Sequence, residues 1–162
     1  MSYDSRGNLI SQTDAIGSTT SWAYDLRNQK ISQTDALGNV TRFEYDAAGR
    51  PVRTIHADGA AESIAYDALN RSTKTTDALG RIHTFAYDAV GNRIRSVDPA
   101  GNVTQSVFDA LNRKTKEIDA LGNITSYTYD ALGRTTEILD ARGNATRMSY
   151  DALGRLVQTV YP

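Results

Sequence analysis

An aromatic residue followed by aspartate returns every 21 residues along the whole chain, without insertion or deletion. The aromatic positions are Tyr3, Tyr24, Tyr45, Tyr66, Tyr87, Phe108, Tyr129 and Tyr150, and the aspartates are Asp4, Asp25, Asp46, Asp67, Asp88, Asp109, Asp130 and Asp151. A fixed period of this length is typical of arrays in which each unit packs only on its neighbours. The sequence therefore predicts a single array of about seven and a half repeats over residues 1–162. We expect this array to be part of a longer one, because no repeat has the polar character of a cap.

Each repeat contains two predicted turns. The Tyr-Asp turn opens at the aspartate after the aromatic residue, and the second turn opens about ten residues later. The second turns open at Asp14, Asp35, His56, Asp77, Asp98, Asp119 and Asp140. Aspartate in the first position and glycine in the fourth are typical of a type I turn followed by a glycine bulge, the usual three-residue hairpin loop.

The glycines support this interpretation. All 12 occupy fourth positions of turns. The Tyr-Asp turns hold Gly7, Gly49, Gly91, Gly133 and Gly154, and the second turns hold Gly17, Gly38, Gly59, Gly80, Gly101, Gly122 and Gly143. The remaining fourth positions are Asn28, Asn70 and Asn112, and asparagine is the next residue to tolerate a positive φ. The pattern predicts a backbone requirement rather than a phosphate-binding or metal-binding loop.

Between the turns lie short segments with strand character. In Val40-Thr41-Arg42-Phe43-Glu44-Tyr45 apolar and polar residues alternate, which predicts a half-buried strand. The same aromatic pair recurs as Trp22 with Tyr24, Phe85 with Tyr87, and Tyr127 with Tyr129. The other segments, such as Lys30-Ile31-Ser32-Gln33-Thr34, favour strands by composition, but their faces cannot be assigned. Helices are excluded because a glycine or turn asparagine interrupts every ten or eleven residues.

The predicted fold class is therefore all-β: a repetitive antiparallel meander of about fifteen strands, two per repeat, that curls as part of a β-shell. A β-propeller is an architectural alternative, because two repeats would supply the four strands of a blade. Its sequence would have to alternate with a 42-residue period, and the 21-residue period dominates.

The unit Tyr-Asp-x-x-Gly-Arg, a Thr/Val-rich strand and Asp-x-x-Gly-Asn-x-Thr resembles the YD repeat of the Rhs family over the whole chain. The resemblance implies strands that spiral into a hollow shell. In bacterial members the shell encloses a toxic domain used in contact-dependent competition or toxin delivery, and a similar shell occurs in animal teneurins. The family's repeats have also been described as carbohydrate-binding. Asp98-Pro99-Ala100-Gly101 resembles the family's self-cleavage motif, but Asn102 follows where leucine is expected, so an ordinary turn is predicted.

Composition gives no reason to expect nucleic acid or membrane insertion. The net charge is -1, and no basic run, long apolar segment or leader-like amino terminus is present. The lack of cysteine excludes disulfides and thiolate metal sites. By the family resemblance we expect the protein to be secreted or on a cell surface.

Several repeated residues allow both a functional and a structural interpretation. The aspartates would be a ladder of calcium ligands or, as we expect, turn caps, because successive turns lie on opposite edges of a meander. The rings of Trp22, Phe43, Phe85 and Tyr127 would stack on glycans or, as we favour, pack across strands. A further ladder comprises Arg50, Arg71, Arg113, Arg134 and Arg155, which we interpret as strand-end charges beside the aspartates.

No catalytic constellation, metal site or cofactor site is predicted. The two histidines, His56 and His83, lack a repeated partner, and a catalytic centre requires a unique arrangement of residues. The favoured function is a structural wall that encloses or presents an effector domain, with further repeats as partners and self-association through open sheet edges. The alternative is a carbohydrate-binding or adhesion module.

Overall fold

A computed structural model describes all 162 residues of the chain. It contains sixteen β-strands and no helix, and thus none that is long and apolar enough to span a membrane. The chain divides into two units, Met1–Ile82 and His83–Pro162. The first unit contains β1 (Ser2–Tyr3), β2 (Leu9–Thr13), β3 (Thr19–Tyr24), β4 (Lys30–Thr34), β5 (Val40–Tyr45), β6 (Pro51–Ile55), β7 (Ala61–Tyr66) and β8 (Ser72–Thr76). The second unit begins within β9 (Ile82–Tyr87) and continues with β10 (Arg93–Val97), β11 (Val103–Phe108), β12 (Lys114–Ile118), β13 (Ile124–Tyr129), β14 (Thr135–Leu139), β15 (Ala145–Tyr150) and β16 (Leu156–Val160).

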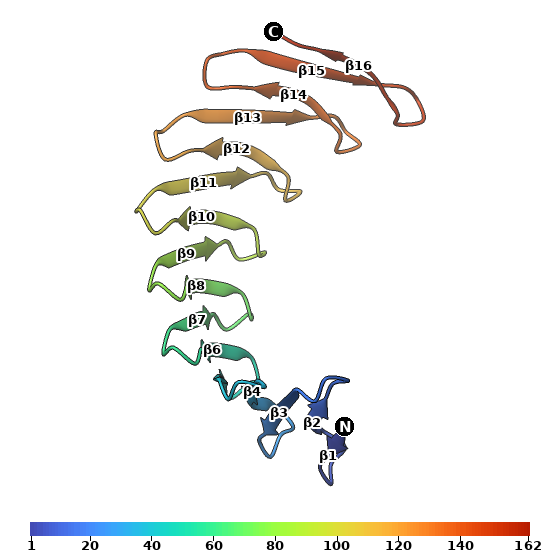
Figure 1. Cartoon of the computed structure of the whole chain (residues 1–162). Coiled ribbons are helices and arrows are strands. Elements are labelled where there is room, and N and C mark those ends of the chain that lie inside the picture. Colours follow the sequence, from blue (N-terminus) through green and yellow to red (C-terminus); the bar gives the residue numbers. More distant parts are fainter. The chain divides into compact units, whose positions relative to one another are not determined.

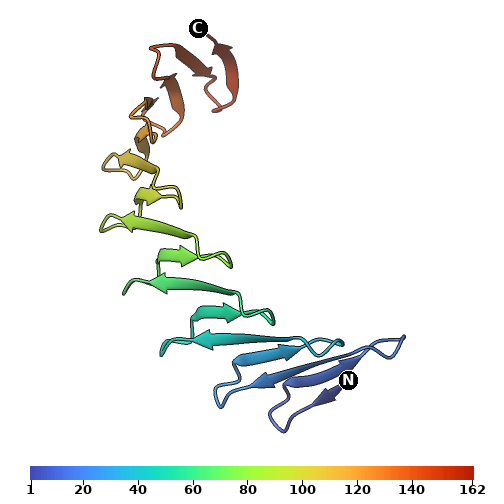
Figure 2. The ribbon, with the colours of Figure 1, turned by 60° about the vertical axis from the view of Figure 1, so that its left-hand side comes forward.

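Within each unit every strand pairs with the next strand in the chain, always antiparallel (Figures 1 and 2). Each 21-residue repeat contributes one six-residue strand and one five-residue strand. The predicted all-β meander is confirmed. The four-stranded blades of the propeller alternative are wrong, because eight strands follow one another in pairing order in each unit. That the whole array forms one domain stays a prediction.

The turns have the predicted backbone geometry. All twelve glycines have positive φ, between 76° and 101°, and Asn28, Asn70 and Asn112 have φ of 61°, 63° and 61°. Each turn is closed by two backbone hydrogen bonds. In one second turn the amide of Gly122 donates to the carbonyl oxygen of Asp119 at 3.0 Å, and the amide of Asp119 donates to that of Asn123 at 3.0 Å. The turns at His56 and at Asp98 have the same pair of bonds, so neither the histidine nor Pro99 changes the hairpin.

The two kinds of turn differ in the strand pairing beside them. Next to each Tyr-Asp turn the register shifts by one residue, as between Glu44 and Tyr45, whose partners are Arg53 and Pro51. The pairings across second turns are regular, as in Thr34 with Val40. A β-bulge therefore accompanies every Tyr-Asp hairpin, and bulges increase local twist.

Strand β5 alternates as the sequence predicts. In β5 Thr41, Phe43 and Tyr45 are half-buried, whereas Arg42 and Glu44 are exposed. Three of the four rings have polar partners on the five-residue strands: Trp22 pairs with Gln33, Phe43 with Thr54 and Phe85 with Ser96, whereas Tyr127 pairs with Ile138. Polar residues opposite the rings give the five-residue strands no alternation of apolar and polar residues. The sequence therefore did not reveal which face of these strands is buried.

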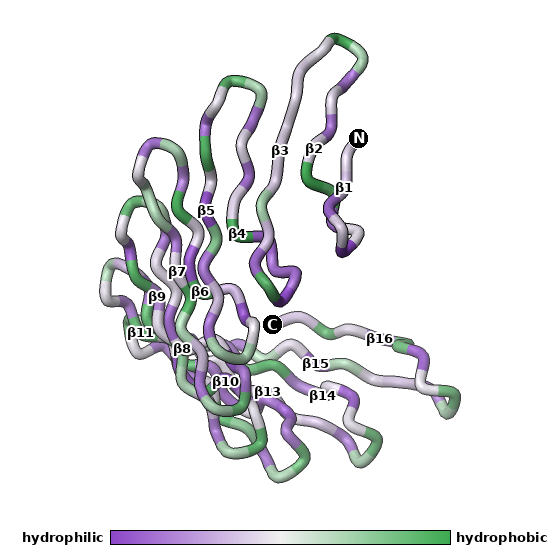
Figure 3. Tube along the Cα trace, turned by 90° about the horizontal axis from the view of Figure 1, so that it is seen from below, coloured by the Kyte–Doolittle hydropathy of each residue, from purple (hydrophilic) through white to green (hydrophobic).

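Neither unit has a buried core. No residue, apolar or polar, is buried, because the sheet is a single layer with nothing packed on either face. The most exposed large apolar side chains lie at turn tips, among them Ile16, Leu37 and Leu121 at 87%, 88% and 87% exposure. Figure 3 shows apolar residues at several turn tips. The fold therefore depends on backbone pairing, turn geometry and contacts between neighbouring strands.

We predict that Gly122→Ala lowers the free energy of unfolding by about 1–2 kcal/mol, because an L-residue is strained in the left-handed region. A Cβ at this position meets no atom within 4 Å, so the cost is conformational and not steric. Thermal and urea unfolding followed by circular dichroism measure the change. Gly122→Asn is the matched control and should lose clearly less, as Asn112 occupies the same backbone conformation. Equal losses in both variants would contradict the explanation.

Candidate functional site

Most turn-opening aspartates bind their own turns through both carboxylate oxygens. In the Tyr-Asp turn at Asp46, Oδ1 accepts hydrogen bonds from the amides of Ala48 and Arg50 at 2.9 and 3.0 Å. Its Oδ2 accepts from Nε of Arg50 at 2.6 Å. The second turn at Asp35 repeats this arrangement, with the side chain of Asn39 donating to Oδ2 at 2.8 Å. Both carboxylate oxygens therefore serve the turn, as the capping interpretation requires.

These hydrogen bonds stabilise the charged form of the aspartates. The side chain of Arg50, and then its amide, hold the pKa of Asp46 below the ordinary value of 3.8. The side chain and amide of Asn39 lower the pKa of Asp35 in the same way. For Asp109 the amide of Arg113 is the larger cause and its guanidinium the next. The carboxylates point into their own turns, and the structure gathers no group of three or more His, Asp or Glu side chains around a common point.

Three arginines that directly follow the fourth residue of a Tyr-Asp turn also reach the next Tyr-Asp turn. The guanidinium carbon lies 4.7 Å from the centroid of a tyrosine ring in the pairs Arg50–Tyr66, Arg113–Tyr129 and Arg134–Tyr150. Nη1 of each arginine donates to the carbonyl oxygen of the aspartate after that tyrosine, at 3.2 Å to Asp67, 3.2 Å to Asp130 and 3.3 Å to Asp151. We call this arrangement the arginine clamp. It joins consecutive turns of one edge through a cation–π contact and a charge-assisted hydrogen bond.

The tyrosines of the repeat make a structural bond of their own. The hydroxyl groups of Tyr45, Tyr129 and Tyr150 donate to the carbonyl oxygens of Lys30, Lys114 and Thr135 at 2.9, 2.6 and 2.8 Å. Each bond joins the end of a six-residue strand to the start of the five-residue strand before it. These hydroxyl groups hold the strands together, which fits the interpretation of the repeated tyrosine as a packing residue. The sequence showed the arginine ladder and the tyrosine ladder separately. It did not show that the arginines cover the tyrosine rings, because that contact spans 16 residues and two strands.

The four residues considered for glycan stacking are half-buried. Cations cover two of their rings: Nζ of Lys30 lies 4.6 Å from the centroid of Phe43, and Cζ of Arg93 lies 5.4 Å from that of Phe85. Nε1 of Trp22 donates to Oε1 of Gln33 at 3.2 Å. A hollow of about 310 Å³ lies beside Trp22 and is lined by Gln12, Asp14, Ser18, Thr20, Trp22 and Gln33.

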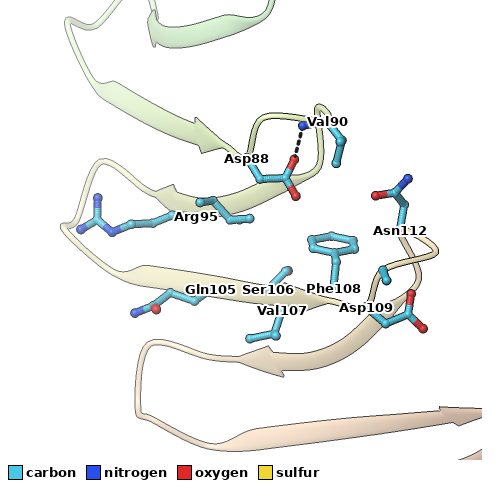
Figure 4. Close-up of a pocket in the computed structure, with 11 residues that line it drawn as sticks. Asp88, Val90, Arg95, Gln105, Ser106, Val107, Phe108, Asp109 and Asn112 are labelled. Atoms are coloured by element: carbon cyan, nitrogen blue, oxygen red, sulfur yellow. Dashed lines mark hydrogen bonds between the residues drawn. The ribbon is translucent and has the colours of Figure 1, made fainter.

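A larger hollow lies at the Tyr-Asp edge of the second unit. Its volume is about 560 Å³, and its lining includes Phe108, Asp88, Asp109, Asn112 and Arg95 (Figure 4). An equivalent hollow of about 440 Å³ lies three repeats earlier, beside Tyr45 and Asp46. Both are open depressions between consecutive Tyr-Asp turns.

The sequence of the chain matches a known repeat family. The RHS Repeat family model matches residues 3–32, 28–61, 87–124, 108–145 and 129–162. The chain belongs to the RHS repeat family. The resemblance inferred from the Tyr-Asp period is thereby confirmed. Comparison with characterised protein sequences gave no match.

The fold also occurs in a solved structure of a toxin complex. A chain of the Photorhabdus luminescens Tc holotoxin pore, which carries a TccC3 mutation, is 17% identical over 98% of this chain, with a TM-score of 0.63. The complexes TcdB2-TccC3-Cdc42 and TcdB2-TccC3 match at 16% and 17% identity over 97% and 99% of this chain, with TM-scores of 0.31 for both. The RHS repeats described here span 12% of the first of these chains and 14% of the other two.

We predict that Arg113→Ala destabilises the fold by about 1 kcal/mol more than Arg81→Ala. Both arginines pair with the aspartate of their own turn at 2.7 Å, but only Arg113 reaches a tyrosine of the next turn. The difference between the two variants in urea unfolding therefore isolates the clamp. Equal destabilisation would show that the contact with Tyr129 contributes nothing.

We also predict loss of stability in acid. Hydrogen bonds lower the folded-state pKa of aspartates such as Asp35, Asp46 and Asp109. Their contribution to the free energy of unfolding is therefore fully present above the unfolded-state pKa near 3.8. It is lost as the pH falls below that value through the depressed folded pKa. The melting temperature should stay level down to about pH 5 and then fall towards about pH 2. A level melting temperature over the whole range would contradict the role given to the carboxylates.

Proposed function

We propose that the chain is a wall segment of a hollow RHS shell that encloses or presents a toxin or effector domain in a secreted or surface-exposed bacterial protein. The observation that carries the proposal is the absence of any buried residue. A single-layer sheet with two uncovered faces is not a self-sufficient domain architecture, since sheets normally bury one face against another layer. In a shell the sheet is completed by further repeats and by contents on its inner side.

Two local features support a curved wall. The β-bulge beside every Tyr-Asp turn, absent beside second turns, gives the two edges of the strip different geometry, and bulges bend the strand that carries them. The apolar turn tips supply contacts for neighbouring windings of such a strip. The likeness in fold to a chain of a Tc holotoxin pore supports a toxin-associated role.

We assign no reaction and no cofactor to the strip. Many repeated polar residues make the same bonds in repeat after repeat, as Asp46 and Asp130 do with Arg50 and Arg134. The activity of the whole protein then belongs to another domain, and the strip contributes a continuous hydrogen-bonded barrier.

The test is cryo-electron microscopy of the polypeptide as its source produces it, together with limited proteolysis. The proposal predicts that residues 1–162 line a closed cavity and that the enclosed domain resists protease until the wall is opened by mild denaturant. A strip exposed on both faces, with the neighbouring domain digested at the same rate before and after denaturant, would refute containment.

We further predict that the isolated chain self-associates, because its apolar turn tips and its edge strands β1 and β16 lack partners. The triple variant Leu37→Ser, Leu79→Ser and Leu121→Ser should lower the average sedimentation coefficient. The matched control is Ala36→Ser, Ala78→Ser and Ala120→Ser in the same three turns, which should leave the distribution unchanged. A monodisperse wild-type monomer in sedimentation velocity would count against the proposal.

One observation favours glycan binding as a second candidate function. The hollow beside Trp22 combines an indole ring with the hydroxyl, amide and carboxylate groups of Gln12, Asp14, Ser18 and Thr20. Aromatic rings with nearby polar groups are suited to sugars. Saturable binding of an oligosaccharide, lost in Trp22→Ala and kept in Tyr127→Ala, would support this function. A glycan panel without any binding would rule it out.

A further inference from the structure

The arginine clamp defines a seat for a guanidinium group at the Tyr-Asp edge. In the seat beside Tyr129, Cζ of Arg113 lies 4.7 Å from the ring centroid, and Nη1 donates to the carbonyl oxygen of Asp130 at 3.2 Å. The seats of Tyr66 and Tyr150 are filled in the same way by arginines 16 residues earlier. The chain itself thus shows which chemical group fits between consecutive Tyr-Asp turns.

The seat at Phe108 has the aromatic ring but lacks the arginine. The residue 16 positions earlier is Asn92, whose side chain donates to Oδ2 of Asp88 at 2.8 Å and to Oδ1 of Asn112 at 3.0 Å. Asparagine is too short to cover the ring. The hollow of about 560 Å³ opens in its place, between Asp88 and Val90 on one turn and Phe108 and Asp109 on the other.

The equivalent hollow three repeats earlier shows what is missing. There Gln29 replaces the arginine, but Nη1 of Arg27 donates to the carbonyl oxygen of Ala47 at 3.0 Å. Gln29 itself donates to the carbonyl oxygen of Gly49 at 3.2 Å, and Lys30 covers Phe43. The chain's own side chains therefore bridge these two turns.

At Phe108 the corresponding cations are absent or turned away. Val90 stands where Arg27 stands in the earlier repeat. Arg93 is the counterpart of Lys30, and its Cζ lies 5.4 Å from the ring centroid of Phe85. Figure 4 shows the guanidinium of Arg95 directed away from Phe108. The hollow therefore keeps an aromatic ring and the carbonyl oxygen of Asp109, and Arg95, the one cation among its lining residues, leaves the ring uncovered.

We propose that this hollow is a docking seat for an arginine side chain of a separate partner polypeptide. The guanidinium lies over Phe108 and donates to the carbonyl oxygen of Asp109, as Arg113 does at Asp130. The carboxylate of Asp88, which lines the hollow, complements its charge, whereas that of Asp109 pairs with Arg113 at 2.7 Å. Arginine fits better than lysine because its planar group stacks on the ring and donates in the same plane. The seat follows from the turns themselves and does not depend on whether the strip encloses a domain.

The test is an NMR titration of the full chain with the blocked peptide Gly-Arg-Gly, and with Gly-citrulline-Gly as the uncharged isostere. Saturable shifts of the Phe108 ring and the Asn112 side-chain amide with the arginine peptide only are expected. Asn92→Arg fills the seat from within and should abolish them. The control Asn102→Arg changes a second turn with the same internal bond, 2.7 Å to Asp98, but the residue 16 positions on is Ile118. This control should bind the peptide as the wild type does.

A second measurement keeps the proposal testable if self-association broadens the spectra. Asn92→Arg should raise the melting temperature by about 2–4 °C, whereas Asn102→Arg should leave it unchanged. No binding, equal binding of the citrulline or a lysine peptide, or an equal effect of both variants on the melting temperature would overturn the proposal. Self-association of the wild type that Asn92→Arg alone removes would assign the seat to a second copy of the chain, and would overturn the choice of a separate partner.

Discussion

The three-residue turn, closed by a residue with positive φ, is the constraint on which the rest of the structure depends. Its two backbone hydrogen bonds reverse the chain every ten or eleven residues, and no strand exceeds six residues. The aspartate that opens most turns organises the loop but is not required for it. The turn at His56 forms with a histidine in that position, while Gly59 keeps its φ of 87°. Backbone conformation thus sets the period, and side chains reinforce it.

A strip without a core must be stabilised by contacts between neighbours. The arginine clamp and the tyrosine hydroxyl bonds couple consecutive Tyr-Asp turns, whereas the second turns are held mainly by their own Asp–Asn bonds. Such a strip behaves as a one-dimensional array whose stability is a sum of local terms. The clamp also explains a difference between repeats, because hollows occur beside Phe108 and Tyr45, where asparagine or glutamine replaces the arginine.

Much of this fold could be predicted from the sequence, because each repeat carries the same local signals. The positive φ values at Asn28, Asn70 and Asn112 followed from the alternation of glycine and asparagine at one position. The face of β5 followed from its alternation. The stacking of Arg113 on Tyr129 and the unfilled seat at Phe108 could not be predicted, since both depend on register across two strands. The polar partners of the rings, such as Gln33 opposite Trp22, likewise concealed the faces of the shorter strands.

If stability is local and carried by the turns, weakening one turn should affect only the strands beside it, and hydrogen–deuterium exchange measures this directly. In Asp119→Ala the amides of Leu121 and Asn123 lose their carboxylate acceptor. We expect faster exchange in this turn and in β12 and β13, with protection kept in β15 and in β2 to β7. A uniform rise in exchange over all strands would show instead that the strip unfolds as one cooperative unit, and would contradict local stabilisation by the turns.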